Sequence, residues 1–332
     1  MYSSKIAGVG HYVPDRIITN DYLSTIMDTN DAWITERTGI KERRYFQLGT
    51  DTVANMAMRA ATMALQRANC PKEAVDFIVF ATITPDYYFP GCGVLLQRDM
   101  GLSHIGALDI RNQCSGFVYA LSVADQFIKT GMYQNILVVG AEIQSSAIDF
   151  SDAGRGVAVI FGDGAGAVLL QRATQPGQGI LSTHLHADGN FAEELCIKDP
   201  GSSREHRRLE NVDSTAGFEA YMNGNQVFKH AVVRFPEVIA EAAEANGYTT
   251  SDIDLLIPHQ ANYRITQYVT EKMGLAPERV VSNIHKYGNT TAASIPIAMS
   301  EAWAEGRINE GDLVCLAAFG SGFAWGSALI RW

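Results

Sequence analysis

Short apolar runs recur along the whole chain, and more polar stretches lie between most of them. The runs are nearly continuous in apolar residues, which is typical of strands that are covered on both faces of a sheet. In the first half we therefore predict strands at 78–83, 107–110, 136–141, 157–161 and 166–170. In the second half we predict strands at 255–258, 280–284, 313–319 and 326–332.

Amphipathic stretches with helical spacing separate these runs. They cover residues 51–69, 115–130, 225–246, 262–273 and 291–305. In 115–130, for example, Phe117, Leu121, Ala124 and Ile128 fall on one face of a helix. The alternation of strands and helices predicts an α/β protein built in layers.

The order of the runs indicates an internal repeat. The run at 78 has a counterpart at 255, and the run at 136 has one at 313, so both pairs share an offset of 177. The run at 166 has its counterpart at 326, at a shorter offset of 160. We therefore expect two similar α/β halves, residues 1–173 and 180–332, with the turn-forming stretch 174–179 as the joint.

The composition of the 332 residues narrows the possible function classes. A formal net charge of −10 argues against binding nucleic acid through an overall basic surface. No apolar run approaches the roughly 20 residues of a membrane-spanning helix, and the first residues do not resemble a signal peptide. The five cysteines are widely spaced without a CxxC pair, which argues against disulfides and structural zinc. We expect a cytoplasmic, reduced protein.

Residues 198–217 interrupt the pattern because they are polar, charged and without a period. We expect a long surface loop there. Its Arg204, Arg207 and Arg208 belong either to a site for an acidic partner or to an ordinary solvated face.

Cys114 is the first candidate for chemistry. It follows the predicted strand 107–110 and immediately precedes the predicted helix 115–130. A helix N-terminus favours a thiolate, and acyl transfer uses a nucleophile in such a turn. The alternative is an ordinary buried cysteine.

His259 and Asn289 occupy similar positions in the second half. His259 follows the strand 255–258, and Asn262 is placed to cap the next helix. Asn289 lies just before the helix 291–305. Functional residues collect at such strand ends in layered α/β proteins, although a single histidine there is often structural.

The glycine-rich stretches 161–170 and 319–330 do not match a dinucleotide-binding loop. A backbone N–H of Gly322 is a candidate oxyanion donor. His184 and His186 fall on one face of a predicted strand, but further ligands are missing nearby, so we expect no metal site.

Seven segments in the same order resemble the β-ketoacyl-acyl-carrier-protein synthase III family of thiolase-fold condensing enzymes. They are residues 28–44, 114–126, 160–170, 182–189, 258–265, 288–296 and 317–332. The resemblance extends over essentially the whole chain. It implies a thiolase-like fold in which the two halves form αβαβα layers, the first carrying Cys114 and the second His259 and Asn289.

The resemblance also implies a reaction, the synthesis of 3-oxoacyl-[acyl-carrier-protein] that initiates fatty acid synthesis. Cys114 would take an acyl group from an acyl-CoA, and malonyl-acyl-carrier-protein would then decarboxylate and condense with it. His259 and Asn289 would stabilise the enolate, and the backbone N–H groups of Cys114 and Gly322 would hold the acyl oxyanion. Phe319 would exclude water from the malonyl carboxylate. The resemblance implies no cofactor beyond these two substrates.

Further residues acquire expected roles by the same resemblance. Those expected to bind coenzyme A are Trp33, Arg37, Arg155 and Asn262, and those expected to line the acyl pocket are Phe89, Gln144, Phe161 and Leu195. Arg264 and Lys229 would dock the carrier protein. Phe89 would cross the interface of a homodimer.

The chain departs from the family pattern at a few positions. Arg111, Asn112 and Gln113 precede the nucleophile where small residues are common, and Thr291 stands where serine is frequent. By the same resemblance, Gln144 stands at a tunnel position that is apolar in the family. A buried amide needs a hydrogen-bonding partner, so we expect either a short or oxygen-tolerant acyl pocket, or amides that bond to the protein itself.

Three other functions were weighed against the synthase. A specialised relative would act in secondary metabolism, as a condensing enzyme or by transferring an acyl group to oxygen or nitrogen, but the presence of both His259 and Asn289 favours condensation. A degradative thiolase needs a second cysteine in the last glycine-rich loop, and Cys315 lies inside a predicted strand instead. A non-catalytic subunit would lack the nucleophile.

Overall fold

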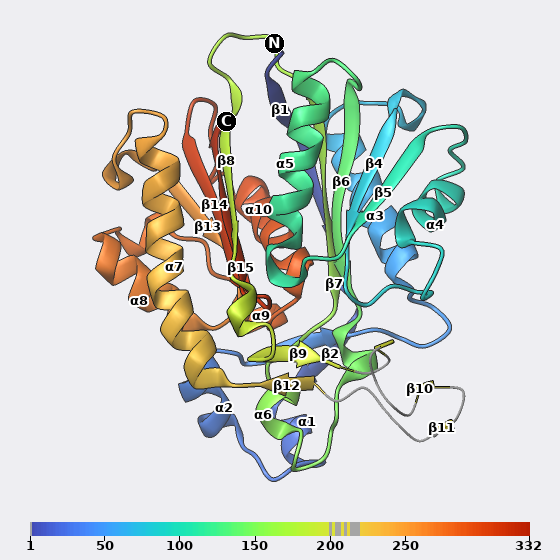
Figure 1. Cartoon of the computed structure of the whole chain (residues 1–332), viewed down its shortest axis with the longest axis vertical. Coiled ribbons are helices and arrows are strands. Elements are labelled where there is room, and N and C mark those ends of the chain that lie inside the picture. The colour runs from blue at the N-terminus through green and yellow to red at the C-terminus, as the bar shows by residue number, and fades with distance from the viewer. Residues whose placement is uncertain (1, 199–200, 203–206, 209–210, 213–219) are drawn as a thin grey trace.

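Two β-sheets form the framework of the computed structural model, which describes residues 2–198, 201–202, 207–208, 211–212 and 220–332 (Figure 1). The first sheet has the order β1 (Ser4–Tyr12), β7 (Gly164–Arg172), β6 (Asn135–Glu142), β4 (Phe77–Ala81), β5 (Gly106–Ile110). The second has the order β8 (Gly179–Ala187), β15 (Ala324–Arg331), β14 (Leu313–Gly320), β13 (Leu255–Pro258).

The two sheets repeat one topology. β4 pairs with β6 in parallel as β13 pairs with β14, and β7 and β15 each add an antiparallel strand beside them. β1 and β8 then complete the same edge of each sheet. The chain passes from the first sheet to the second between Arg172 and Gly179. The internal repeat predicted from the apolar runs is therefore confirmed by the strand order.

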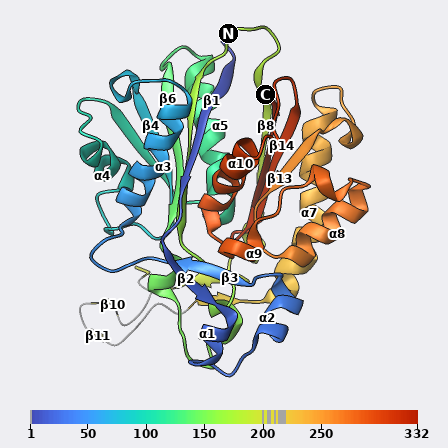
Figure 2. The same ribbon diagram turned by 180° about the vertical axis from the view of Figure 1, so that it is seen from behind.

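Helices cover both sheets and separate them. The outer face of the first sheet carries α3 (Val53–Arg67) and α4 (Cys92–Asp99), and that of the second carries α7 (Gly224–Glu244) and α8 (Tyr263–Met273). Between the sheets lie α5 (Gly116–Lys129) and α10 (Ser294–Ala304), as Figures 1 and 2 show. This is the αβαβα order expected of a thiolase-like fold, and that prediction is confirmed.

The sequence explains which helices lie inside. Every residue of α10 from Ser294 to Ser300 is buried, because the helix has sheet on both sides. Strands β4 and β14 are likewise buried at every position. By contrast, α7 presents one buried stripe, including Ala231, Phe235 and Ile239, to the second sheet. A helix that is apolar all round belongs to an interior layer, whereas an amphipathic helix belongs at the surface.

A smaller region lies beyond one end of the two sheets, at the bottom of Figure 1. It contains the hairpin of β2 (Arg16–Thr19) and β3 (Glu42–Tyr45), with α1 (Asn20–Ser24), α2 (Asp31–Thr38) and α6 (Arg155–Ala158). Leu23, Ile34 and Ile40 form its small core with Ala158. The remaining described elements are α9 (Ile284–Tyr287), the pair β9 (Leu195–Ile197) and β12 (Ala220–Met222), and the short pair β10 (Arg207–Arg208) and β11 (Asn211–Val212).

Two predicted strands are wrong. Residues 157–161 belong mostly to α6 and its C-cap, and only Phe161 makes an isolated bridge, to Asn289. Residues 280–284 contribute one bridge, between Val280 and Leu256. Short apolar runs do not distinguish a strand from other buried segments, and here Ala158 and Val159 fill the small core around α2 instead.

Most of the predicted loop 198–217, including Arg204, lies outside the described residues. Within the described ranges, no helix combines the length and apolarity needed to cross a membrane.

Candidate active site

Cys114 lies in a single 3-10 turn, η2 (Gln113–Ser115), between β5 and α5, as the sequence predicted. Its side chain is 7% exposed. A Cβ atom at Gly320, at the end of β14, would come within 2.8 Å of the Cys114 sulfur, so only glycine fits there. The backbone N–H groups of Ser321 and of Cys114 itself hydrogen-bond toward the thiol. The nucleophile candidate is thus enclosed by the last glycine-rich turn of the chain.

Burial, and to a smaller extent the nearby Glu142, raises the pKa of the Cys114 thiol to about 12. The two N–H groups oppose this shift but do not cancel it. The N–H groups favour a thiolate, as expected of a helix N-terminus, but burial has the larger effect on the pKa of this thiol. Loss of solvation outweighs the favourable dipole, and the thiol is protonated in the substrate-free chain.

His259 follows β13 and is 1% exposed. Its backbone N–H donates to the carbonyl of Ala317 on β14, 2.8 Å away, and its Nδ1 lies 2.6 Å from the Ser294 hydroxyl. That hydroxyl also accepts a long hydrogen bond of 3.4 Å from the backbone N–H of Gln260. Either tautomer of the ring fits the Ser294 contact; when Ser294 donates to Nδ1, the ring proton lies on Nε2, which is buried and has no partner among the described residues.

Asn289 is held by backbone and side-chain contacts together. Its N–H donates to the carbonyl of Ile160 and its carbonyl accepts from Gly162, at 2.9 and 3.0 Å. The side-chain oxygen accepts from the N–H of Thr291 at 2.8 Å. With its oxygen so occupied, the amide presents its NH₂ group as the end available to a ligand.

The two sheets bring the three candidates together. Cys114 and His259 share β14, since one packs against Gly320 and the other bonds to Ala317. Asn289 precedes the 3-10 turn η7 (Thr291–Ala293), in which Ala292 packs against Gly116 at the start of α5. The structure therefore packs the turn of Cys114 against β14 and against η7, which Asn289 precedes. Cys114 and His259 follow strands as predicted, whereas Asn289 follows the short helix α9 instead.

The glycine-rich turn after β14 holds the remaining predicted site residues. Phe319 is buried and packs its ring 4.9 Å from that of Phe323. Gly322 has a φ of 137°, a conformation that side chains disfavour, and its N–H stays an expected oxyanion donor. Sequence reasoning missed Ser321, whose N–H faces the sulfur, because spacing alone cannot choose between adjacent amides.

Two of the expected acyl-pocket residues adjoin this centre. The carbonyl of Leu195 accepts a hydrogen bond from the Ser321 hydroxyl, and Phe161 lies beside Asn289. Phe89 instead is 82% exposed at a loop tip, next to the equally exposed Tyr88.

Gln144, the polar residue expected at the pocket, is 6% exposed and donates to the Thr291 hydroxyl at 2.7 Å. Its amide is therefore satisfied by the protein, which was one of the two expected outcomes. It follows Glu142 at the end of β6, an acid that sequence reasoning missed although it ends a strand of otherwise apolar residues.

Glu142 is fully buried beside this group. Its carboxylate accepts hydrogen bonds from the hydroxyls of Thr82 and Thr84, at 3.1 and 2.6 Å, and from the N–H of Ile83. Burial nevertheless raises its pKa to about 7. A charge at this position acts on Cys114 from inside the protein.

The four residues expected to bind coenzyme A form one connected group at the surface. The guanidinium groups of Arg37 and Arg155 lie 4.7 and 5.6 Å from the ring centroid of Trp33. The Asn262 side chain donates to the carbonyl of Arg37 at 3.0 Å and caps α8 by accepting from the N–H of Arg264. The predicted cap is confirmed, and the cluster offers a flat aromatic ring between two cations.

Arg264 and Lys229, the expected docking residues, are both exposed on neighbouring helices, α8 and α7. The rings of Phe228 and Tyr268, 6.5 Å apart, join these two helices.

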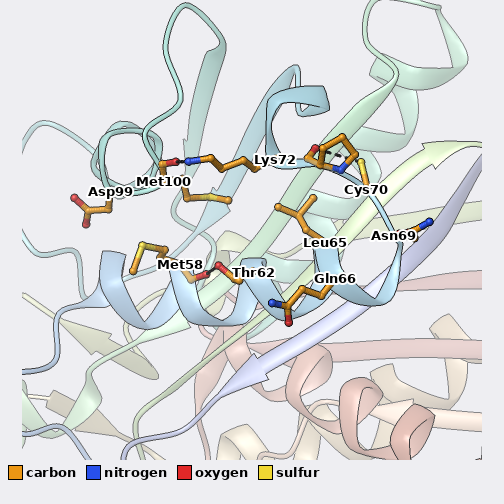
Figure 3. Close-up of a pocket in the computed structure, with 10 residues that line it drawn as sticks. Met58, Thr62, Leu65, Gln66, Asn69, Cys70, Lys72, Asp99 and Met100 are labelled. Carbon is orange, nitrogen blue, oxygen red and sulfur yellow. Dashed lines mark hydrogen bonds between the residues drawn. The ribbon is translucent and has the colours of Figure 1, made fainter.

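Two other features lie apart from this centre. Figure 3 shows a surface groove lined by Met58, Leu65, Cys70, Lys72 and Met100 of α3, α4 and the loop between, none of them part of the cysteine site. His184 and His186 both contact Glu241, at 3.3 and 2.6 Å. Among the described residues, no group of three or more His, Cys, Asp or Glu is arranged to hold a metal ion.

Comparison with known proteins agrees with this geometry. Residues 108–189 match the model of 3-oxoacyl-[acyl-carrier-protein (ACP)] synthase III, and residues 243–332 match that of its C-terminal region. The chain is 46% identical to a β-ketoacyl-[acyl-carrier-protein] synthase III of Alkalilimnicola ehrlichii, with 100% of both chains covered. It is 44% identical to the protein of the same name from Bradyrhizobium diazoefficiens, covering 99% of this chain and 98% of the relative.

Solved structures share the fold. The 3-oxoacyl-[acyl-carrier-protein] synthase III of Aquifex aeolicus is 43% identical with a TM-score of 0.90, covering 99% of this chain and 100% of that one. A priming β-ketosynthase of a polyketide pathway is 31% identical with a TM-score of 0.91, covering 99% of this chain and 96% of that one. The chain therefore belongs to the β-ketoacyl-[acyl-carrier-protein] synthase III family of acyltransferase condensing enzymes.

Proposed function

We propose that this chain condenses an acyl-CoA primer with malonyl-acyl-carrier-protein, with Cys114 as the acyl carrier and His259 and Asn289 as the enolate-binding pair. One observation carries the proposal. A buried, neutral imidazole with its Nε2 unpartnered and a fixed amide NH₂ adjoin the segment that holds the buried thiol. Two neutral donors beside a nucleophile suit a reaction whose charge develops on a thioester oxygen.

In the first half-reaction the Cys114 sulfur attacks the thioester carbonyl of the primer. The carbonyl oxygen gains negative charge, and the N–H groups of Cys114 and of Ser321 or Gly322 stabilise it. The C–S bond to coenzyme A then breaks, and coenzyme A leaves as the thiol with the proton that the cysteine gave up. The acyl group remains on Cys114 as a thioester.

In the second half-reaction the malonyl thioester loses CO₂. The electron pair of the broken C–C bond becomes an enolate, whose oxygen accepts hydrogen bonds from Nε2–H of His259 and from the Asn289 amide. Phe319, buried in an aromatic cluster, contributes an apolar wall that disfavours the charged carboxylate. The enolate carbon attacks the acyl thioester, Cys114 leaves and is reprotonated, and a 3-oxoacyl-carrier product is released. This chemistry calls for no metal or prosthetic group.

The proposal assigns surfaces to both substrates. Trp33 with Arg37 and Arg155 takes the adenine and phosphates of coenzyme A, since an aromatic ring stacks on a base and guanidinium groups pair with phosphate. Exposed Lys229 and Arg264 form a local basic surface for the acidic carrier protein, which the chain needs because its net charge is −10.

The chain acts as a homodimer in this proposal. β5 is the edge strand of the first sheet, with Leu108 exposed on it, and the loop before α4 exposes Tyr87, Tyr88 and Phe89. An unpaired edge beside aromatic side chains is a surface that pairs with a second copy. Phe89 would then close the acyl pocket of the partner.

The cellular role proposed is the initiation of fatty acid synthesis in the cytoplasm. The relatives at 44–46% identity carry the synthase III name, whereas the polyketide enzyme is 31% identical. The specialised alternative therefore has less support.

The deciding experiment separates the half-reactions by intact-protein mass spectrometry. Acetyl-CoA should add one acetyl group to wild type and none to Cys114→Ala, and malonyl-acyl-carrier-protein should then remove it as 3-oxobutyryl product. His259→Ala and Asn289→Ala should become acetylated but discharge the group roughly 10²–10³ times more slowly. Label on Cys114→Ala, or normal discharge by both other variants, would contradict the proposal.

A further inference from the structure

The backbone of Thr291 adopts an unusual conformation next to the proposed enolate site. Its φ is +50°, in the left-handed region that β-branched residues rarely occupy. Glycine would meet no such strain, yet the chain has threonine here. Some contact of the threonine side chain must therefore hold the residue in this conformation.

Gln144 supplies that contact. Its side-chain amide donates to the Thr291 hydroxyl at 2.7 Å, across 147 residues of sequence, and both groups are buried. Gln144 begins the 3-10 turn η3 (Gln144–Ala147), which is itself tied down because the N–H of Ser145 donates to the buried Asp163 at 2.9 Å. The backbone that carries the Gln144 amide is therefore held in place.

Thr291 in turn fixes Asn289. The Thr291 N–H donates to the Asn289 side-chain oxygen, 2.8 Å away. This N–H belongs to the peptide that joins Thr290 to Thr291, so a Thr291 that shifts after losing its side-chain anchor would carry the N–H away from the amide. Asn289 would then be able to turn its oxygen, rather than its NH₂ group, toward the substrate.

The neighbouring contacts hold the backbone of η7, including the Thr291 carbonyl, which accepts from the N–H of Ser294. The carbonyl of Ala292 packs so closely on β6 that a Cβ at Gly140 would lie 2.3 Å from it, and the Ala292 N–H hydrogen-bonds to Glu142. Thr291 itself depends on its hydroxyl for a side-chain anchor.

We propose that Gln144 is a positioning residue for the condensation step, because its hydrogen bond to Thr291 keeps the Asn289 amide oriented with NH₂ toward the enolate. The inference rests on the proposed function, in which Asn289 donates to that enolate. Gln144 touches no reacting atom. It occupies a position expected to line the acyl pocket, but its amide donates to Thr291, the residue that holds Asn289.

Near-isosteric substitutions test this chain of contacts. Thr291→Val keeps the shape and branching but lacks the hydroxyl, Gln144→Leu lacks the amide, and Thr291→Ser restores the hydroxyl. We expect kcat for condensation at saturating malonyl-acyl-carrier-protein to fall roughly tenfold in the first two and to recover to within about threefold in the third. The rate of Cys114 acetylation by acetyl-CoA should stay within about twofold of wild type in Thr291→Val and Thr291→Ser.

The matched control is Gln171→Leu. Gln171 makes a side-chain hydrogen bond of the same length, 2.7 Å to Asn135, at the far end of β7. Gln171→Leu therefore removes a side-chain hydrogen bond of the same length away from the site. The condensation rate of this variant should equal that of wild type. Thermal unfolding of every variant identifies any that fail to fold, and Thr291→Val decides the matter where Gln144→Leu does not fold.

A double-mutant cycle distinguishes positioning from general loosening. Once Asn289→Ala has removed the oriented amide, adding Thr291→Val or Gln144→Leu should slow condensation no further. Full multiplicative loss in the double variants, or normal kcat in both Thr291→Val and Gln144→Leu while Asn289→Ala is slow, would overturn this inference alone. Normal condensation by Asn289→Ala would instead overturn the proposed function itself.

Discussion

The Nδ1 atom of His259 lies 2.6 Å from the hydroxyl oxygen of Ser294, the first residue of α10. This contact joins the end of β13 to the helix that separates the two sheets. In the proposed reaction, Ser294 donates to Nδ1 and so leaves the ring proton on Nε2, where it faces the enolate.

Replacing that serine should affect one half-reaction selectively. In Ser294→Ala the imidazole loses the partner that holds its tautomer, and Nδ1 is left buried without a hydrogen bond, which costs about 1–3 kcal/mol of stability. We expect condensation to slow roughly tenfold while acetylation of Cys114 is unchanged. Mass spectrometry of quenched samples measures both the acetylation of Cys114 and the later discharge of the acetyl group. Equal slowing of both steps would show that the serine supports the site only generally.

The rate of condensation should not depend on the titration of a histidine with an ordinary pKa. Burial lowers the pKa of His259 to about 3, so the imidazole stays neutral at all working pH values. We expect kcat for condensation to show no decline with an apparent pKa near 6.5 when the pH falls from 8 to about 5.5. A loss of activity centred near 6.5 that disappears in His259→Gln would contradict this.

The same shift has a consequence for stability. At pH values between about 6.5 and 3, His259 binds a proton in the unfolded chain but not in the folded chain. The contribution of this residue to the free energy of unfolding is therefore complete above 6.5 and is lost as the pH falls toward 3. Denaturant titrations of wild type and His259→Gln across this window should diverge as the pH falls.

Glu142 should control the reactivity of the resting nucleophile. Its negative charge raises the pKa of Cys114, and Glu142→Gln removes that charge while keeping one acceptor oxygen. We expect iodoacetamide to alkylate Cys114 several times faster in Glu142→Gln than in wild type at pH 8. In both proteins the rate should keep rising with pH up to at least 9, since the thiol is protonated throughout. A plateau below pH 8 in wild type would show that the resting cysteine is already a thiolate.

Much of this arrangement was predictable because its determinants are local in sequence. The apolar runs and their repeat predicted both sheets, and Cys114 and His259 stand where strands give way to helices. The supporting residues could not be predicted in the same way. Ser294 contacts His259 across 35 residues of sequence, and Gln144 contacts Thr291 across 147 residues. No local pattern in the sequence indicates such distant contacts.

The protonation states also needed the fold. A helix N-terminus predicts a reactive thiolate at Cys114, but the depth of burial and the presence of Glu142 reverse that expectation, and both depend on how η2 packs against β14. The conformation of Thr291 is likewise set by a tertiary contact, since its own residue type disfavours a positive φ.

The exposed aromatic loop predicts the oligomeric state. Wild type should scatter light as a species of about twice 36.2 kDa at micromolar concentration. In the proposed dimer Phe89 anchors the interface and completes the acyl pocket of the partner, so Phe89→Ser should weaken the dimer and lower acylation by acetyl-CoA together. Leu48→Ser, an equally exposed loop residue at 88%, should change neither. A wild-type protein that remains at 36.2 kDa would exclude the dimer.

The Trp33 cluster predicts how the primer is recognised. Trp33→Ala removes the ring that Arg37 and Arg155 both contact, and with it the surface proposed for the adenine base. Stacking of a base on an aromatic side chain contributes about 1–3 kcal/mol, so KM for acetyl-CoA should rise roughly 5- to 150-fold with little change in kcat. Acetyl-pantetheine has no nucleotide, and its kcat/KM should be the same in wild type and Trp33→Ala. Asn262 donates to the Arg37 carbonyl, and in the proposed complex it contacts the pantetheine arm, so Asn262→Ala should weaken both thioesters. If Trp33→Ala weakened acetyl-pantetheine as much as acetyl-CoA, the tryptophan would be supporting the loops around the site rather than binding the nucleotide.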